Sequence, residues 1–289
     1  MRPASFEYCK PRSLAELQAL LRDNDGNRKI LAGGQSLVPM MNFRMAMPGV
    51  LIDINGLHEL DYVDDAGSAL RIGALARHNR VMHSEVVRAG CPLLAQAYEN
   101  VAHHTVRNRG TLAGNVCHAD PASEMPAVLL ALDAVLHVQG QAGVRRVAAE
   151  DFFLGMYTTA VEPDEFLAEI EIPKFDASRT GHFLELSQRK GDFAICGIAV
   201  AFSLVHGLFK DVRIACCGVG EKQSRLVQAE QWLENRPADA ASIAGCGSIA
   251  AGLVDPPSDT KASGAYRRHL VGVLSAKAIE AALADLNRR

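Results

Sequence analysis

Short segments with two different hydrophobic periods alternate along this 289-residue chain. After a capping box formed by Ser13 and Glu16, leucines recur with helical spacing, which predicts a first helix that ends near Asp23. Residues 29–31 and 50–54 are short apolar runs of the kind found in buried strands. Mixed helices and strands are therefore expected from the beginning of the chain.

The same patterns continue to the C-terminus in two blocks. The first block predicts strands over 69–74, 134–139, 143–147 and 166–172, and helices over 79–88, 92–102, 123–132 and 149–153. The second block predicts a strand meander over 182–186, 193–205 and 208–219, with a turn at His206-Gly207, and then helices over 224–234, 238–251 and 265–287. The polar stretch 174–181 separates the blocks and predicts a domain boundary.

These blocks indicate an α+β protein with a first domain over 1–176, made of subdomains of about 1–55 and 56–176, and a second domain over 177–289. The irregular mixture of strands and helices differs from the repeated βαβ units of a Rossmann sheet, and the chain contains no GxGxxG. A Rossmann fold is therefore not expected.

Composition is that of a soluble globular chain, with 48% hydrophobic and 22% charged residues. The net charge of -3 gives no basic footprint for nucleic acid or for an anionic membrane surface. The N-terminal residues lack the apolar core of a signal peptide, and no apolar run approaches the length of a membrane span. We expect a cytoplasmic protein that binds neither nucleic acid nor membrane.

Metal chemistry is not predicted for this chain. The seven cysteines are odd in number and show no CxxC spacing, so we expect reduced residues and no iron–sulfur cluster. No HExxH or other zinc spacing occurs, and His103-His104 and His118 are expected in loops or in the core. The methionines of 39–47 are interpreted as core filler, and Gly218-Val219-Gly220-Glu221-Lys222 as the end of a strand.

One candidate binding element follows the first apolar strand. Ala32-Gly33-Gly34-Gln35-Ser36 is a small-residue turn ahead of a helical pattern that begins at Leu37. Two adjacent glycines let a ligand approach the backbone amides, and Ser36 adds a hydroxyl where helix dipoles favour an anion. The segment either cradles a diphosphate or is a plain turn between a strand and a helix.

A second turn of the same kind favours the cradle. Arg109-Gly110-Thr111-Leu112-Ala113-Gly114-Asn115 again combines small residues with Thr and Asn, and it leads into a segment that begins at Cys117. The pair AGGQSLVP and TLAGNVCHADPASEMPAVLLALDA resembles the FAD-binding medium subunit of molybdenum hydroxylases, the family of carbon monoxide dehydrogenase, quinoline oxidoreductase and xanthine dehydrogenase. The likeness covers nearly the whole chain, including the RKGDFAI and GVG segments.

The resemblance implies a PCMH-type fold like that of vanillyl-alcohol oxidase. Two α+β subdomains would clamp an extended FAD, and a C-terminal antiparallel sheet with helices would close over the flavin. Covalent relatives on this fold often attach FAD through a histidine in the first loop, where this chain has Gln35, so non-covalent FAD is expected. In most relatives the second loop has two glycines, but here the first is Ala113, which could lengthen one contact to phosphate.

The resemblance also implies a set of cofactor-binding residues and no catalytic residue. They are Lys29, Ile30, Leu31, Ala32, Gly33, Gly34, Gln35, Ser36 and Leu37 in the first loop region, Thr111, Ala113, Gly114 and Asn115 in the second, and Val101, Glu124, Leu167, Lys190 and Phe193 elsewhere.

Three of these residues keep two interpretations. Glu124 is either a carboxylate that accepts from the sugar hydroxyls of the cofactor, with no unusual pKa, or a charge at a helix start. Lys190 is either a positive group near the flavin ring or a solvated lysine, and Phe193 is either a stacking lid or a core residue; Ile195 lies in the same segment.

The function implied by the resemblance is electron transfer. FAD in this chain would receive electrons from [2Fe–2S] clusters of a small partner subunit, while a large molybdopterin subunit oxidises the substrate, in a dimer of heterotrimers. A free-standing FAD-dependent oxidase or reductase of the same fold is the alternative. A third interpretation is a non-catalytic assembly protein that keeps the fold without the cofactor.

Overall fold

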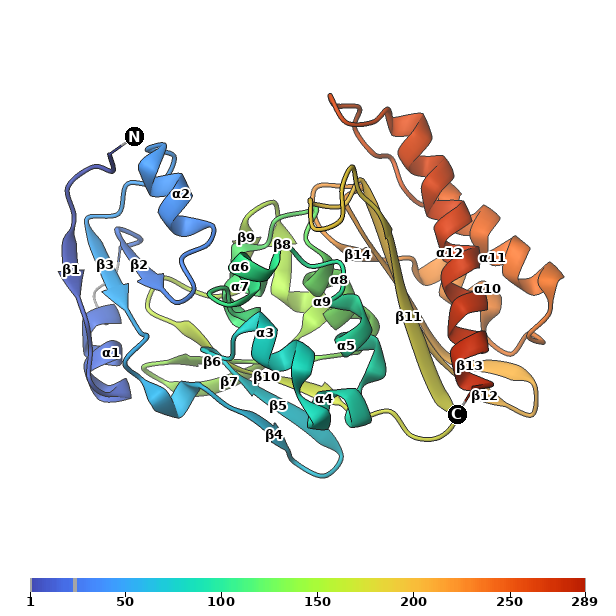
Figure 1. Cartoon of the computed structure of the whole chain (residues 1–289), viewed down its shortest axis with the longest axis horizontal. Helices are drawn as coiled ribbons and strands as arrows, with labels where there is room; N and C mark the ends of the chain where they lie inside the picture. Colours follow the sequence, from blue (N-terminus) through green and yellow to red (C-terminus); the bar gives the residue numbers. More distant parts are fainter. Residues whose placement is uncertain (1, 23–24, 289) are drawn as a thin grey trace.

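The computed structural model describes residues 2–22 and 25–288, and its first sheet is parallel (Figure 1). Strands β1 (Glu7–Cys9), β3 (Val50–Asp53) and β2 (Arg28–Leu31) lie in that order. Helices α1 (Leu14–Leu21) and α2 (Leu37–Asn42) provide the connections that parallel strands require. Because the carboxyl ends of parallel strands meet at one edge, the loops after β2 and β3 lie together.

The second sheet is antiparallel and has five strands. Its order is β4 (Val63–Asp65), β5 (Ala69–Gly73), β10 (Phe166–Pro173), β6 (Val135–Gly140) and β7 (Gly143–Ala148). The helices of this part are η1 (His58–Leu60), α3 (His78–His83), α4 (Glu85–Gly90), α5 (Pro92–Ala97), α6 (His104–Arg107), α7 (Leu112–His118), α8 (Glu124–Ala131) and α9 (Ala149–Phe152). A small hairpin follows, with β8 (Phe153–Gly155) and β9 (Thr158–Thr159).

The C-terminal part is an antiparallel sheet covered by helices. Strands β11 (Arg179–Leu186), β12 (Cys196–Val205), β13 (Leu208–Cys217) and β14 (Ser224–Arg225) are followed by α10 (Val227–Leu233), α11 (Ala240–Gly252) and α12 (Gly264–Leu286). Along β12 the side chains alternate in size: Ile198 and Val200 pack in the core beneath these helices, whereas Ala199 and Ala201 belong to the core of the N-terminal part. The small alanines let α8 pack closely on β12 and β13.

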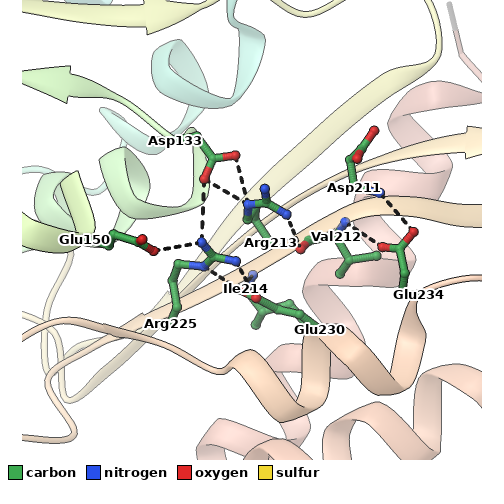
Figure 2. A network of polar contacts seen from close by, with 9 residues as sticks. All are labelled: Asp133, Glu150, Asp211, Val212, Arg213, Ile214, Arg225, Glu230 and Glu234. Atoms are coloured by element: carbon green, nitrogen blue, oxygen red, sulfur yellow. Dashed lines mark hydrogen bonds and ion pairs between the residues drawn. The ribbon is translucent and has the colours of Figure 1, made fainter. Parts of the chain in front are cut away.

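Helix α8 is buried on every side, as all eight of its residues are inaccessible. A helix that is apolar all round lies inside a protein, and α8 packs against α5 and α7 of its own part and against the C-terminal sheet. An ion-pair network reinforces this contact (Figure 2). Arg213 Nε lies 2.8 Å from Asp133, just beyond α8, and Arg225 contacts Glu150 of α9 at 3.2 Å and Glu230 of α10 at 2.6 Å.

Several expected elements are confirmed. Ser13 Oγ accepts a hydrogen bond from the Glu16 amide at 3.2 Å and caps α1; the expected helix end near Asp23 lies outside the described residues. His206 and Gly207 both have positive φ, 51° and 75°, as the turn of a tight hairpin requires. All seven cysteines are free. No helix in the described part of the chain is long and apolar enough to cross a bilayer.

Two of the expected helices are shorter or divided. The helix expected over 79–88 is divided into α3 and α4, because Ser84 leaves helical geometry and its Oγ accepts from the Val87 amide. The helix expected over 92–102 ends at Ala97, and Ala102 adopts a left-handed φ of 47°.

Other boundaries were wrong because strand pairing outweighed local composition. Residues 224–225 pair with β13, so the helix expected from Ser224 begins only at Val227. Strand β11 begins at Arg179 instead of His182, inside the polar stretch 174–181, and β12 begins at Cys196 instead of Phe193. The methionine prediction was wrong in part: Met41 is buried, but Met45 and Met47 are 75% and 64% exposed.

Candidate functional site

A pocket of about 430 Å3 lies where the parallel sheet meets the second sheet. It is lined by Leu31, Ala32, Gly33, Gly34, Gln35, Val38, Pro39, Asn55, Arg77 and Arg109. The first loop, residues 32–36, follows β2, and Asn55 follows the neighbouring strand β3. Asn55 Nδ2 therefore reaches the Ala32 carbonyl at 2.9 Å and fixes the start of the loop.

The backbone of the first loop is open to a ligand. The amides of Gly33, Gly34, Gln35 and Ser36 have no hydrogen-bond acceptor among the described residues, and Ser36 Oγ makes no capping bond to α2. Gly34 has a φ of +70°, a conformation that glycine adopts without strain. Four consecutive free amides are an arrangement that suits an anionic oxygen group.

The first and second loops touch each other through Gly33. A Cβ at this position would lie 2.6 Å from both the Arg109 carbonyl oxygen and Gly110 Cα. An isolated β-bridge between Arg77 and Thr111 and a hydrogen bond from the Leu112 amide to the Ala76 carbonyl hold the second loop beside α3. The structure therefore brings the two sequence-predicted loops together, and glycine at 33 is what permits it.

The second loop is a helix start more than an open turn. Thr111 is the N-cap of α7; its Oγ1 accepts from the Gly114 amide at 3.0 Å and its carbonyl accepts from the Asn115 amide at 3.0 Å. The Ala113 amide has no acceptor in the described part of the chain. The side chain of Asn115 bonds to Ser123 at 2.7 Å. The second loop therefore offers fewer free backbone amides to a ligand than the open turn expected from the sequence.

A buried, neutral histidine packs against the second loop at Gly110. His78, only 4% exposed, lies against Gly110, whose Cβ would be 2.8 Å from the imidazole ring. Burial, with smaller effects from Arg107 and Arg77, lowers the pKa of His78 to about 4. The imidazole is therefore uncharged at neutral pH.

Glu124 lies at the first position of α8 and is 3% exposed. Its carboxyl group interacts with its own backbone amide, which lowers its pKa slightly against larger opposing effects. Burial, and next Glu185 of β11, raises the pKa of Glu124 to about 8, and burial raises the pKa of Glu185 to about 7. The expectation of an ordinary pKa for Glu124 was therefore wrong: a carboxyl group so placed is mostly protonated at neutral pH and can donate as well as accept.

The remaining expected residues form two groups. Val101 and Leu167 are buried, at 2% and 4% exposure, whereas Lys190 is exposed and Phe193 is 45% exposed. Phe193 is therefore not a core residue. The turn that carries both approaches the second loop region, because a Cβ at Gly191 would lie 2.7 Å from His103 Nδ1. In the first loop region Lys29 and Gln35 are exposed, and Ile30 and Leu37 are half-buried.

The loop after β13 joins the C-terminal sheet to the segment that precedes α8. The Gly218 amide donates to the Pro121 carbonyl at 2.8 Å, and Lys222 Nζ donates to the Phe153 carbonyl at 2.8 Å. Gln223 Nε2 donates to the carbonyls of Asp120 and Ser123 at 2.5 and 3.3 Å. The expected strand end at 218–222 is thus a contact between the two parts of the chain.

Comparison with known proteins assigns the fold and the two loops to a family. Residues 4–175 match the domain described as FAD binding domain in molybdopterin dehydrogenase, and residues 181–282 match the CO dehydrogenase flavoprotein C-terminal domain. The chain belongs to the FAD-binding medium subunits of molybdenum hydroxylases. The structure has the architecture expected from the sequence, an FAD-binding domain followed by an antiparallel sheet with helices.

Relatives of this medium subunit match along their whole length. It is 38% identical to the caffeine dehydrogenase subunit beta of Pseudomonas sp. (strain CBB1), over 96% of this chain and 95% of that one. The carbon monoxide dehydrogenase structure from Hydrogenophaga pseudoflava superposes with a TM-score of 0.96 at 36% identity, covering 98% and 99% of the two chains. The structure of quinoline 2-oxidoreductase from Pseudomonas putida 86 superposes with a TM-score of 0.93 at 34% identity, covering 99% of each chain.

The residues of the medium subunit fit an FAD molecule. The four free amides of the first loop and the guanidinium groups of Arg77 and Arg109 suit a diphosphate, and the buried Glu124, whose pKa is raised to about 8, suits a polar group of the cofactor. Flavin supplies redox chemistry that links one-electron and two-electron partners. What this chain supplies is binding and orientation.

Sequence reasoning missed three polar residues of the pocket, namely Asn55, Arg77 and Arg109, and two apolar ones, Val38 and Pro39. Asn55 and Arg77 had a weak signal, since each is a polar residue that comes shortly after a buried strand, β3 and β5 respectively. Arg109 lay within the second loop but was not assigned a role.

One group of described residues has the composition of a metal site: His137, Glu169 and Glu171, whose ligand atoms lie within 4.8 Å of one another. Both carboxylates already have other partners. Tyr62 donates to Glu169 at 2.6 Å, and Arg146 lies 3.1 Å from Glu171. Hydrogen bonds and ion pairs account for this cluster, which lies on the five-stranded sheet.

Proposed function

We propose that this medium subunit is the electron-transfer subunit of a molybdenum hydroxylase complex. Electrons would reach its FAD from [2Fe–2S] clusters of a small partner subunit and pass to an external acceptor, while a large molybdopterin subunit oxidises the organic substrate. The observation that most directly supports this proposal is the sequence and structural similarity, over nearly the full length, to subunits of enzymes named for caffeine, carbon monoxide and quinoline. Relatives with such different substrates share this chain's whole length, which supports substrate selection in another subunit.

Within this function, we propose that FAD binds non-covalently between the first and second loops. The free amides of 33–36 and the Ala113 amide would face phosphate oxygens, with Thr111, Gly114 and Asn115 shaping the second loop. Val101 and Leu167 would provide apolar contacts, Glu124 a polar contact, and the exposed turn of Lys190 and Phe193 would border the flavin ring. Gln35 offers no nucleophilic imidazole for a covalent link.

The assembly we propose is a dimer of heterotrimers with the small and large subunits, located in the cytoplasm. Seven free cysteines support a reducing compartment. We also propose that the FAD-binding domain covers 1–176 and that 177–289 forms the second domain. The contacts of α8 with β12 and β13 would then be the interface between these domains.

Anaerobic flavin reduction tests the proposal. The purified subunit, alone and then reconstituted with its small and large subunits, is mixed with candidate aldehydes and N-heterocycles while the flavin absorbance band is followed. We expect the isolated subunit to contain FAD and to react with dyes, yet to be bleached by an organic substrate only in the complex. Bleaching of the isolated subunit at the rate of the complex would instead establish a free-standing flavoenzyme. A preparation that binds no FAD would point to an assembly protein.

A further inference from the structure

Two guanidinium groups lie at the first loop without carboxylate partners. Arg77 and Arg109 both line the pocket beside Gly33 and Gly34. Neither forms an ion pair within 4.0 Å among the described residues, whereas Arg71, Arg80, Arg145, Arg213 and Arg225 each do. Arg77 is half-buried, and burial lowers its pKa; the carboxylates of Asp61 and Asp53, beyond ion-pair distance, oppose this effect, and the positive charge of Arg109 adds to it.

The side chain of Arg77 is held in place by neutral acceptors from two parts of the fold. Its Nη2 donates to Asn55 Oδ1 at 2.5 Å, at the edge of the parallel sheet, and its Nη1 donates to the Arg109 carbonyl. Asn55 is in turn fixed, because its Nδ2 donates to Asp53 Oδ1 at 2.6 Å and to Ala32. A guanidinium group has five N–H donors, so three remain for a ligand.

A positively charged group that is partly removed from water and faces a like charge is unfavourable unless an anion compensates it. The four free amides of 33–36 border the same pocket. Two cationic side chains and a row of amides match the two negative charges and several acceptor oxygens of a diphosphate. A neutral ligand group would leave both guanidinium groups without an anion in direct contact.

We propose that Arg77 is a diphosphate-binding residue that makes this subunit select FAD over FMN and riboflavin. The inference rests on the proposed function, because it concerns the same site. Arg77 neutralises the diphosphate directly, and its bonds to Asn55 and Arg109 keep the two loops at the spacing that the diphosphate bridges.

The test uses the full chain, freed of flavin by dialysis, and four ligands: FAD, ADP, FMN and riboflavin. Dissociation constants come from flavin fluorescence, and for ADP from competition with FAD. We expect Arg77→Met to weaken the binding of FAD and ADP by about 10- to 100-fold, because a hydrogen bond from a charged group is lost. The dissociation constant of riboflavin should not change. The salt dependence of FAD binding should also decrease, since one charge contact is lost.

Two further variants separate charge from geometry. Arg77→Lys keeps the charge and should retain part of the affinity and of the salt dependence. Arg80→Met is the matched control. Arg80 lies on the same helix α3 but donates to Asp61 at 2.7 Å, outside the pocket, so its replacement should leave the dissociation constants of all four ligands unchanged.

Contrary outcomes are distinguishable. If Arg77→Met weakens riboflavin as much as FAD and leaves the salt dependence unchanged, Arg77 only ties the loops together and the proposal is wrong. Wild-type FAD affinity in Arg77→Met would also overturn it while leaving the proposed function intact. Failure of the wild-type chain itself to bind FAD would instead contradict the proposed function.

Discussion

Replacing Gly33 with alanine should separate the two loops that form the proposed cofactor site. The added Cβ would lie 2.6 Å from the Arg109 carbonyl oxygen and from Gly110 Cα, whereas ordinary contacts begin at 3.4 Å. Both obstacles are backbone atoms, so the loops must move apart by about 0.8 Å, because no side chain can rotate away. Overpacking of this kind costs about 1–3 kcal/mol of folding free energy.

The same displacement widens the space between the amides of 33–36 and the second loop. If it breaks one or two of the hydrogen bonds proposed to hold the diphosphate, FAD affinity should fall by about 10- to 100-fold. Flavin fluorescence measures the dissociation constant, and thermal unfolding of the flavin-free protein measures stability.

Two glycines with positive φ provide controls for Gly33→Ala. Gly67 has a φ of +84° and no atom within 4 Å of an added Cβ, so Gly67→Ala should cost about 1 kcal/mol of stability and leave FAD binding unchanged. Gly34→Ala adds the same backbone strain, and its nearest obstacles are side-chain atoms of Leu31 and Val38 at 3.0 and 3.2 Å, which can yield. We expect Gly33→Ala to weaken FAD binding most. If its affinity and stability match those of Gly67→Ala, the two loops do not touch and the site geometry is wrong.

Three further predictions concern protons and the flavin link. His78 has a pKa near 6.5 in the unfolded chain but about 4 in the folded protein, so the free energy of unfolding should fall by about 3 kcal/mol as the pH decreases through this window. In denaturant titrations, the free energy of unfolding of His78→Gln should depend less on pH in the acid range. Glu124 has the opposite behaviour, because its pKa is about 8 in the folded protein and near 4.5 in the unfolded chain, so stability is lost as the pH rises between these values. Glu124→Gln should therefore stabilise the flavin-free protein by about 3 kcal/mol at pH 7. An unchanged unfolding midpoint would contradict this prediction. Since Gln35 offers no imidazole for a covalent link, acid precipitation should leave yellow flavin in the supernatant, and a yellow pellet would disprove non-covalent binding.

The sequence predicted those features that depend on local patterns. The small-residue turn at 32–36 and the His206-Gly207 hairpin follow from the conformational freedom of their residues, and the apolar run 123–132 is indeed a buried helix. Features that depend on pairing were missed: residues 224–225 have no strand pattern of their own and extend only because β13 offers them a free edge. The helix start at Thr111 had a recognisable capping residue, but Gly114 in its first turn made a loop seem the better interpretation.

Arg77 and Asn55 were missed for a different reason. They are 22 residues apart and show no shared motif, and only the arrangement of two sheets places the guanidinium group against Asn55 Oδ1. A polar residue after a buried strand is common, so its role becomes visible only when the neighbouring strand end is known. Site residues supplied by different sheets are therefore harder to predict than loops that carry their own glycines.

The glycine-rich segment 218–222 shows how the C-terminal part positions the chain between α7 and α8. Gly218 has a φ of +76°, and a Cβ there would lie 2.8 and 2.9 Å from the carbonyl oxygens of Ala194 and Ile195, so glycine is required for packing and not for phosphate binding. Arg267 of α12, only 5% exposed, donates to the carbonyls of Ile195 and Gly218 at 2.6 Å and fixes both strand ends. Because the Gly218 amide bonds to Pro121, this rigid unit positions the chain between α7 and α8, and with it Glu124. The proposed cofactor site therefore depends on both parts of the chain, although both of its loops lie in the first.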